Sequence, residues 1–222
     1  MAFFTKTNKS IIIKIMIKIG NLEFKIEESN AIVKRFYNDT KEVVIPSQIE
    51  YEGKEYNVTK IGVKAFSYCD KLTSITIPNS IKEIGEHALY NCESLSSIII
   101  PNSVEKIGRR AFCYCNKLTS VTISDSVIEI GDSVFFLCRN LTSVTLPKHL
   151  KEIKPYMFCE CNNLTSLIIP ESVIKIGEMA FAYCEKLKTI NIPKSVKEIG
   201  KNAFLECTQL NYTIPEGVTY IE

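Results

Sequence analysis

The amino-acid sequence predicts a mostly β fold in which the chain winds into a solenoid of stacked 23-residue coils with short parallel strands and a β-hairpin cap at the N-terminal end. Three observations predict it: leucine recurs every 23 residues, apolar and polar residues alternate after each leucine, and one cysteine recurs in every period. The leucines are Leu72, Leu95, Leu118, Leu141, Leu164, Leu187 and Leu210. A fixed period of this length is typical of a repeat architecture.

Each period begins with a short strand. The positions three and five residues after the leucine are apolar, so one face of an extended segment is buried and the other faces solvent. Proline follows in most periods and ends the strand, because it has no N–H to donate to a neighbouring strand. The inward residues include Ile75 and Ile77 in one coil, Val121 and Ile123 in another, and Ile190 and Ile192 near the C-terminus.

A second short apolar unit follows and ends at a glycine. This glycine indicates a corner that requires positive φ. From the glycine to the next leucine there are only ten residues, too few for a long helix, so we expect a short irregular or 3₁₀-like turn. The glycines are Gly62, Gly85, Gly108, Gly131, Gly177 and Gly200, and Lys154 interrupts their column.

One coil alone cannot bury these apolar side chains, but stacked coils can, because each side chain then packs on its copies in the neighbouring coils. The most prominent such column is a phenylalanine ladder in the turn after the glycine. Truncating one of its rings should cost roughly 3–5 kcal/mol. The ladder residues are Phe66, Phe112, Phe135, Phe158, Phe181 and Phe204.

The columns, written together as LxxIxIPxxVxxIGxxAFxxCxx, resemble the BspA-like leucine-rich repeat from Val58 to Glu222. The resemblance implies a right-handed leucine-rich-repeat solenoid with an N-terminal cap. Because this family is abundant in surface proteins, it also implies adhesion to host or neighbouring-cell proteins. The chain departs from the common leucine-rich pattern in one column, where asparagine often forms a ladder. That column holds Ser80, Ser103, Ser126, Ser172 and Ser195, with His149 in the fourth coil.

Three segments are expected along the chain. Residues 1–19 read as a leader followed by an edge strand, since Lys14 and Lys18 interrupt the apolar run and no small-residue cleavage site follows. The run is too short and too charged to cross a bilayer, so we expect no integral membrane segment. Residues 20–57 do not repeat and predict a β cap with a hairpin tip at Gly53. Residues 58–222 predict about seven coils, the last one incomplete.

The recurring cysteine is best explained as a small apolar residue at the place where the chain turns back. Disulfides between coils would need Cβ atoms closer than a strand spacing of about 4.8 Å provides. Abundant unpaired thiols favour a reducing compartment. The column is Cys69, Cys92, Cys115, Cys138, Cys161, Cys184 and Cys207.

Two cysteines outside the column raise the question of metal binding or catalysis. Cys113 and Cys159 belong to the triplets CYC and CEC, which are two coils apart and too distant for one zinc ion. No histidine column accompanies them, so we expect no metal and no cofactor. His149 and Cys159 could form a cryptic thiol enzyme, but no orienting partner is visible. The net charge of +2 gives no general attraction for nucleic acid.

The outward positions of the first strand form a hydroxyl-rich, nearly uncharged surface, which is the predicted binding face. Its residues are Ser74, Thr76, Ser97, Ile99, Ser120, Thr122, Ser143, Thr145, Ser166, Ile168, Thr189 and Asn191. The second unit instead carries Lys–Glu pairs that can interact laterally between coils, such as Lys82-Glu83 and Glu105-Lys106. Aromatic hot-spot residues are missing from these faces, which argues against a tight small-ligand site.

The most consistent function is a non-enzymatic protein-binding scaffold whose partners are proteins. By resemblance, binding serves adhesion at a cell surface or in a secreted protein. An intracellular interaction adaptor is the first alternative, because the thiols and the missing signal peptide favour the cytoplasm. The cryptic thiol enzyme is the second alternative.

Overall fold

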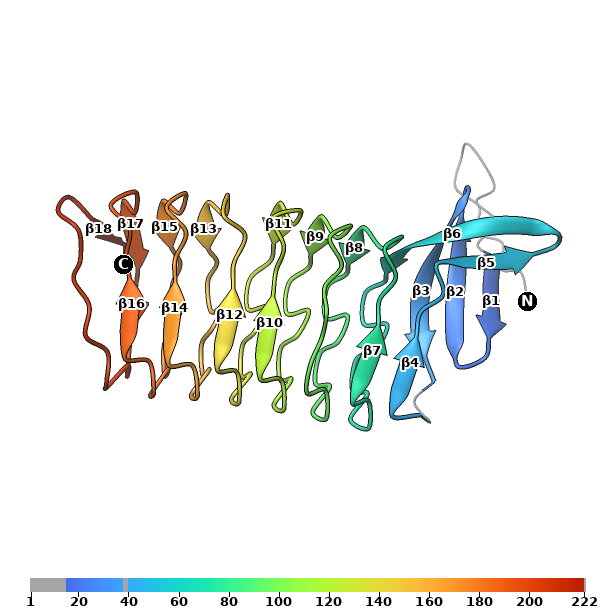
Figure 1. The fold of residues 1–222 in the computed structure, drawn as a ribbon, viewed down its shortest axis with the longest axis horizontal. Coiled ribbons are helices and arrows are strands. Elements are labelled where there is room, and N and C mark those ends of the chain that lie inside the picture. The colour runs from blue at the N-terminus through green and yellow to red at the C-terminus, as the bar shows by residue number, and fades with distance from the viewer. Residues whose placement is uncertain (1–14, 38–39, 222) are drawn as a thin grey trace.

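The structure, a computed structural model, describes residues 15–37 and 40–221. In these residues the chain forms strands and turns without any helix. The coils stack along one long axis (Figure 1). This confirms the predicted β-solenoid with coils of about 23 residues, since equivalent residues such as Val121 and Val144 lie opposite each other in parallel strands.

The strands at the N-terminal end form an antiparallel meander that joins the solenoid. β1 is the edge strand and pairs with β2, which pairs with β3, and β3 pairs in parallel with β6. β5 and β6 form the hairpin predicted around Gly53, whose φ is 70°. The bounds are β1 (Ile15–Ile19), β2 (Leu22–Glu27), β3 (Asn30–Phe36), β4 (Glu42–Val44), β5 (Gln48–Tyr51) and β6 (Lys54–Ile61).

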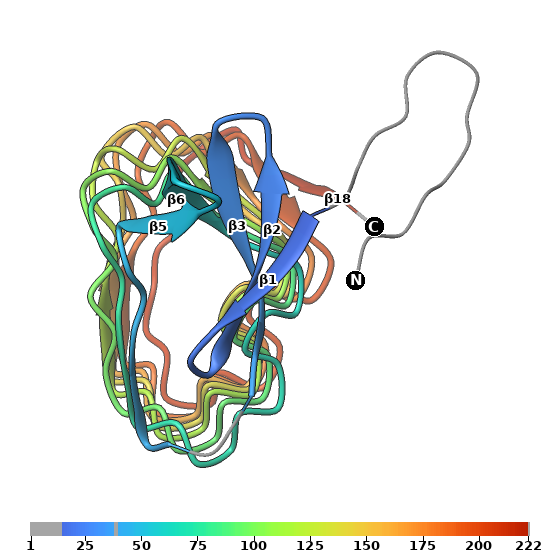
Figure 2. The same ribbon diagram turned by 90° about the vertical axis from the view of Figure 1, so that its right-hand side faces the viewer.

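Viewed along the solenoid axis, β1, β2 and β3 lie at one end of the coil stack (Figure 2). They bring Phe24 and Val33 into the same buried core as the repeats. β6 crosses the predicted boundary between residues 57 and 58, so that division of the chain stays a prediction. The leader expected before the edge strand falls on residues 1–14, outside the described part of the chain.

Each coil of the solenoid contributes up to two short strands. The first strands are β7 (Ser74–Thr76), β10 (Ser120–Thr122), β12 (Ser143–Thr145), β14 (Ser166–Ile168) and β16 (Thr189–Asn191). The second strands are β8 (Glu83–Ile84), β9 (Lys106–Ile107), β11 (Glu129–Ile130), β13 (Glu152–Ile153), β15 (Lys175–Ile176), β17 (Glu198–Gly200) and β18 (Thr219–Ile221). These strands pair in parallel, because each coil repeats the path of the one before.

The phenylalanine ladder runs through the core. The rings of Phe112, Phe135, Phe158, Phe181 and Phe204 are stacked, with neighbouring centroids 5.4–5.7 Å apart. Leu89 takes the ladder position between Phe66 and Phe112 and is fully buried. At the N-terminal end Phe36 of the meander packs on Phe66 with centroids 5.4 Å apart, so the cap continues the ladder.

The segment between glycine and cysteine uses its amides in two directions. Phe66 N and Tyr68 N donate to the carbonyls of Ala88 and Tyr90 in the next coil, each at 2.8 Å. Between these two residues, Ser67 N donates to Lys64 O at 3.2 Å, a contact of the i→i−3 type expected for a 3₁₀-like turn. Hydrogen bonds to the next coil thus alternate with hydrogen bonds within the turn, and together they satisfy the backbone amides of a segment that is neither helix nor strand.

The repeat glycines do not have positive φ, so that expectation is wrong. Non-glycine residues occupy the left-handed region instead, such as Lys64 with φ 57° and Tyr68 with φ 62°. Glycine is needed for space, because a Cβ at Gly108 would lie 2.5 Å from the backbone nitrogen of Glu86 in the preceding coil. Any side chain at this position would push neighbouring coils apart.

Lys154 stands where the other coils have glycine, and the long sheet is interrupted at this coil. One sheet ends at β11 and another begins at β13. One coil later, Gly177 N donates to Ile153 O at 2.7 Å. Among the described residues no such bond joins Lys154 to Ile130. We attribute the interruption to the Cβ of Lys154, which the close approach of two coils does not accommodate.

Candidate interaction surfaces

The twelve residues predicted as the binding face lie side by side on one surface, which we call the strand face. They come from β7, β10, β12, β14 and β16 and from the coil of Ser97, and Figure 1 shows these strands in one row. The register places Ser120 opposite Ser143 and Ile168 opposite Asn191, and Ser97 forms a bridge with Ser120. All twelve are exposed except Ser74, which is half-buried. Strand alternation causes this, because the residues between them fill the core.

The strand face carries exposed apolar side chains among its hydroxyl groups. Ile99 is 83% exposed and Ile168 is 79% exposed, which is high for isoleucine. In the C-terminal half the face is hollowed into an open depression lined by Ser166, Ile168, Thr189 and Asn191. Tyr212 of the last coil completes this lining. Tyr212 was not predicted. The last repeat is one residue short, and the structure places Asn211 and not Tyr212 opposite Thr189, so the column positions do not carry over to this coil.

A second surface, formed by the second strands, is charged and paired across coils. Glu83 and Glu129 lie on either side of Lys106 in the register of β8, β9 and β11. The Lys106–Glu129 pair measures 2.9 Å, and Lys60 contacts Glu83 at 2.7 Å. The predicted lateral pairing is therefore present. The Lys106–Glu129 pair is exposed and the Lys60–Glu83 pair is half-buried. Ion pairs near the surface contribute roughly 0.2–1 kcal/mol each, so we assign them to holding the register of the coils and not to binding.

The cysteine column has a structural explanation. Each thiol after the first donates to a carbonyl in the preceding coil, as Cys92 Sγ does to Phe66 O at 3.1 Å and Cys138 Sγ to Phe112 O at 3.1 Å. All nine cysteines are free, and all but Cys207 are buried. Burial raises the pKa of the Cys69 thiol to about 12, which keeps it protonated and unreactive at neutral pH.

The serine column forms a similar ladder, and it accounts for His149. Ser126 Oγ donates to Val104 O at 2.9 Å, and His149 Nε2 lies 3.2 Å from Val127 O, the equivalent carbonyl one coil later. No hydrogen bond joins His149 to Cys159 in the part of the chain that the structure describes. Burial raises the pKa of Cys159 to about 11, so its thiolate is scarce at neutral pH. These observations give the thiol-enzyme hypothesis no support.

The described residues contain neither a cluster of metal ligands nor a membrane-spanning helix. Within residues 15–37 and 40–221, no three His, Cys, Asp or Glu side chains gather closely enough to hold a metal ion. The same residues include no helix that is long and apolar enough to cross a bilayer.

The third surface lies between the glycine and cysteine columns, and sequence reasoning missed its main feature. Here the exposed or half-buried aromatic residues Tyr68, Tyr90, Tyr114 and Phe136 follow one another from coil to coil. They alternate between two adjacent columns, with spacings of 22, 24 and 22 residues, so no single 23-residue column contains them all. A search that allowed neighbouring columns to mix would have found this row. The absence of aromatic hot-spot residues was expected of the strand face and the charged face only, and this third surface was not considered.

Comparison with known proteins gives a consistent result. The sequence profile described as "BspA type Leucine rich repeat region" matches residues 36–163 and 151–222 with six copies. A leucine-rich repeat protein from Bacteroides ovatus has a similar crystal structure, with 29% identity and a TM-score of 0.68 over 91% of this chain and 60% of that one. A leucine-rich repeat protein from T. pallidum shows 25% identity and a TM-score of 0.62 over 92% of this chain and 85% of that one. No curated protein matches the chain significantly.

The chain thus spans about three fifths of the Bacteroides ovatus protein, since the alignment covers 60% of it. A leucine-rich repeat protein from Eubacterium ventriosum shares the fold at 21% identity, with a TM-score of 0.55 over 93% of this chain and 47% of that one. The names of these proteins describe a repeat and not an activity.

Proposed function

The chain belongs to the BspA-type leucine-rich repeat family, and from this premise we propose that it is a non-enzymatic scaffold that binds a protein partner through its strand face. Adhesion to a host or neighbouring-cell surface protein is the form of binding that we favour. The repeat scaffold supports the proposal because stacked coils present one side-chain pattern over a long flat surface.

One observation carries the choice of face. The strand face combines exposure with an absence of charge among its twelve residues, and it leaves Ile99 and Ile168 uncovered by their own coils. Burying uncharged hydroxyl and methyl groups costs less desolvation than burying ion pairs. The charged face lacks this property, because its lysines and glutamates already pair with each other.

Two variants at matched positions test the choice of face. Ile168→Lys alters the strand face, and Ile174→Lys alters the charged face of the same coil, where Ile174 is 51% exposed. Partners are first identified in a binding screen against extracellular-matrix and cell-surface proteins. Ile168→Lys should lower the affinity for any specific partner by at least about tenfold, corresponding to about 1.4 kcal/mol of binding free energy. Ile174→Lys should leave it unchanged. Equal loss in both variants would contradict the strand-face proposal.

The intracellular adaptor is the second candidate function, favoured by the nine free cysteines. Protease treatment of intact source cells separates it from adhesion. A surface adhesin is digested when added protease reaches it, and a cytosolic adaptor is protected. A wholly protected pool would overturn adhesion while leaving the scaffold role intact.

A further inference from the structure

The aromatic row, defined as Tyr68, Tyr90, Tyr114 and Phe136, is a continuous feature of the third surface. Its ring centroids are 5.4, 5.5 and 6.0 Å apart in succession, and each pair meets edge to face. His87 joins the row beside Tyr90, with centroids 5.3 Å apart. Edge-to-face pairs of this kind fix each ring against the next.

The row is uncovered at its N-terminal end. Tyr68 is 65% exposed although its ring is held by Tyr90, and its backbone nitrogen donates to Tyr90 O at 2.8 Å. Tyr114 N similarly donates to Phe136 O at 2.9 Å. Rings fixed in this way lose little conformational entropy when a partner covers them, which is a property of aromatic anchors in protein interfaces.

Cations without ion-pair partners flank the row. Arg109 contacts Glu86 at 3.0 Å. In contrast, Lys64 and Arg110 form no ion pair within the described residues, although Lys64 assists Arg109 in lowering the pKa of the Glu86 carboxyl. Arg110 Nε is buried there without a hydrogen-bond acceptor. Lys64 and Arg110 stand four residues before Tyr68 and Tyr114, so each cation occupies the same turn as a tyrosine of the row.

The aromatic row and these cations are confined to the first coils. Five coils after Tyr68 the same column holds Tyr183, which has almost the same φ (61° against 62°) but no partner in the aromatic row. Acids occur in early and late coils of this surface: Glu86 pairs with Arg109, Glu160 pairs with Arg139 at 3.0 Å, and Glu178 accepts from Tyr156. The aromatic row is therefore the feature that distinguishes the first coils.

We propose that the aromatic row, with Lys64 and Arg110, is a second docking surface that binds an acidic segment of a partner protein. Carboxylates of the segment contact the two cations, and an apolar or aromatic side chain beside them covers Tyr68 and Tyr90. Tyrosine and arginine are the residue types enriched where binding energy concentrates. This surface is separate from the strand face, so the present proposal can be correct or wrong independently of the function proposed above.

The test uses the full chain and a random copolymer of glutamate and tyrosine as the probe. The copolymer should bind, and added salt should weaken binding, because unpaired cations are screened. Tyr68→Ser, and Lys64→Gln combined with Arg110→Gln, should each weaken binding roughly tenfold. Thermal unfolding of each variant reports whether the solenoid is retained.

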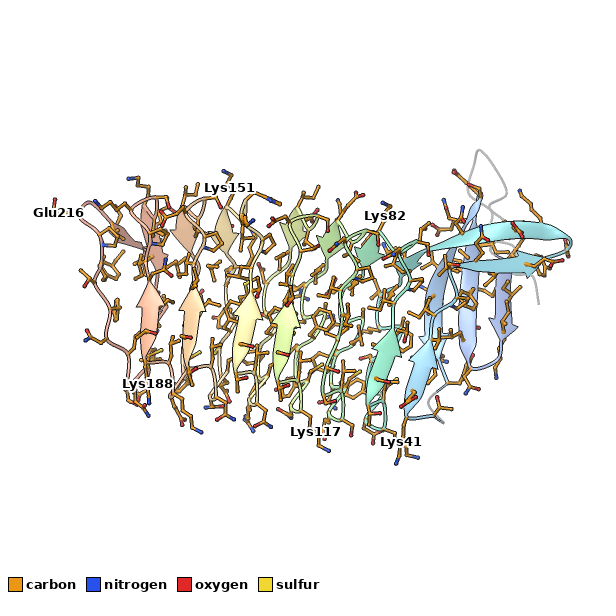
Figure 3. All side chains as sticks on the ribbon, in the orientation of Figure 1. Lys41, Lys82, Lys117, Lys151, Lys188 and Glu216 are labelled. Atoms are coloured by element: carbon orange, nitrogen blue, oxygen red, sulfur yellow. The ribbon has the colours of Figure 1, made fainter. Side chains whose placement is uncertain are left out.

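Matched controls are available on the same chain. Tyr183→Ser removes an exposed tyrosine from the same column outside the row. Lys151→Gln combined with Lys188→Gln removes the same charge from two lysines of later coils, which lie on opposite edges of the solenoid in Figure 3 and outside the aromatic row. Both controls should bind the copolymer like the unaltered chain.

Three outcomes would overturn the proposal. Equal weakening by the control variants would show that the effect is not local to the row. Heparin binding with the same variant dependence as the copolymer would show a general polyanion site. A dimer in light scattering that Tyr68→Ser dissociates would show that a second copy covers the row.

Discussion

Gly131 lies so close to the preceding coil that a Cβ added to it would stand 2.4 Å from the backbone nitrogen of Arg109. The contact is backbone to backbone, so neither partner can rotate away. It explains why glycine recurs once per coil although these glycines have ordinary φ values. The spacing of the coils is thus limited by the absence of a side chain at one position.

Gly131→Ala should therefore destabilise the protein. Real Cβ contacts do not occur at this distance, so the coil must shift at a cost of roughly 1–3 kcal/mol or more. Chemical denaturation measures the change in the free energy of unfolding. Asp132→Ala, one residue later, serves as the control and should have little effect. A Gly131→Ala variant as stable as the control would contradict the close-approach explanation.

Lys154→Gly tests the same explanation in the opposite direction. Glycine in an ordinary exposed position costs roughly 0.5–1 kcal/mol of backbone entropy. At position 154 a restored hydrogen bond to Ile130, worth roughly 0.5–1.5 kcal/mol, should offset that cost. We expect unchanged or higher stability and slower hydrogen exchange at residue 154. Lys151→Gly on the same coil should destabilise, and an equal loss in both variants would argue against the steric origin of the interruption.

Phe135→Ala should be among the most damaging single truncations. Its ring is fully buried between Phe112 and Phe158, with centroids 5.7 Å away on both sides. Removing it should cost roughly 3–5 kcal/mol in the free energy of unfolding. Phe204→Ala, at the partly buried end of the ladder, should cost clearly less. Equal costs would mean that the ladder is not a cooperative core.

The thiols should make stability depend on alkaline pH. Burial raises the pKa of Cys113 to about 12 and that of Cys159 to about 11. A thiol with a raised folded pKa keeps its proton more firmly when folded. Its contribution to the free energy of unfolding is complete below the pKa of the thiol in the unfolded chain, about 8.5. That contribution is lost as the pH rises toward the pKa of the thiol in the folded protein.

Thermal unfolding between pH 7 and pH 11 measures this loss, and the melting temperature should fall across the range. Tyrosine and lysine also titrate near pH 10, so the informative comparison is a variant with Cys113→Ala and Cys159→Ala. Its melting temperature should fall less steeply. Identical slopes for the variant and the unaltered chain would show that these thiols do not couple to folding.

The sequence predicted the coil well because a column depends on local alternation and on burial. Leu72, Ile75 and Ile77 are inward by strand geometry alone, and a 23-residue period then repeats them. The free state of the cysteines was predicted for a similar reason, since one thiol per coil is too far from its copies to bond. A β cap over residues 20–57 was also expected, but the stacking of its Phe36 ring on Phe66 was not.

Contacts between residues of different columns could not be predicted from the 23-residue period. Tyr68 meets Tyr90 because the backbone bonds of this surface join residues 22 apart, as Tyr68 N to Tyr90 O shows. The offset between neighbouring coils is a property of their packing and not of either coil. The same holds for His149, whose role depends on the position of Val127 O.

By itself the sequence determined the repeat, its strands, the inward columns and the uncharged strand face, because side-chain direction follows from local backbone geometry and from the need to bury apolar groups. Only the tertiary structure decided that glycine serves close approach, that Lys154 interrupts the sheet, and that four aromatic rings meet on a second surface. Those features depend on how far and with what offset one coil lies on the next, and that placement arises from contacts between residues more than twenty positions apart.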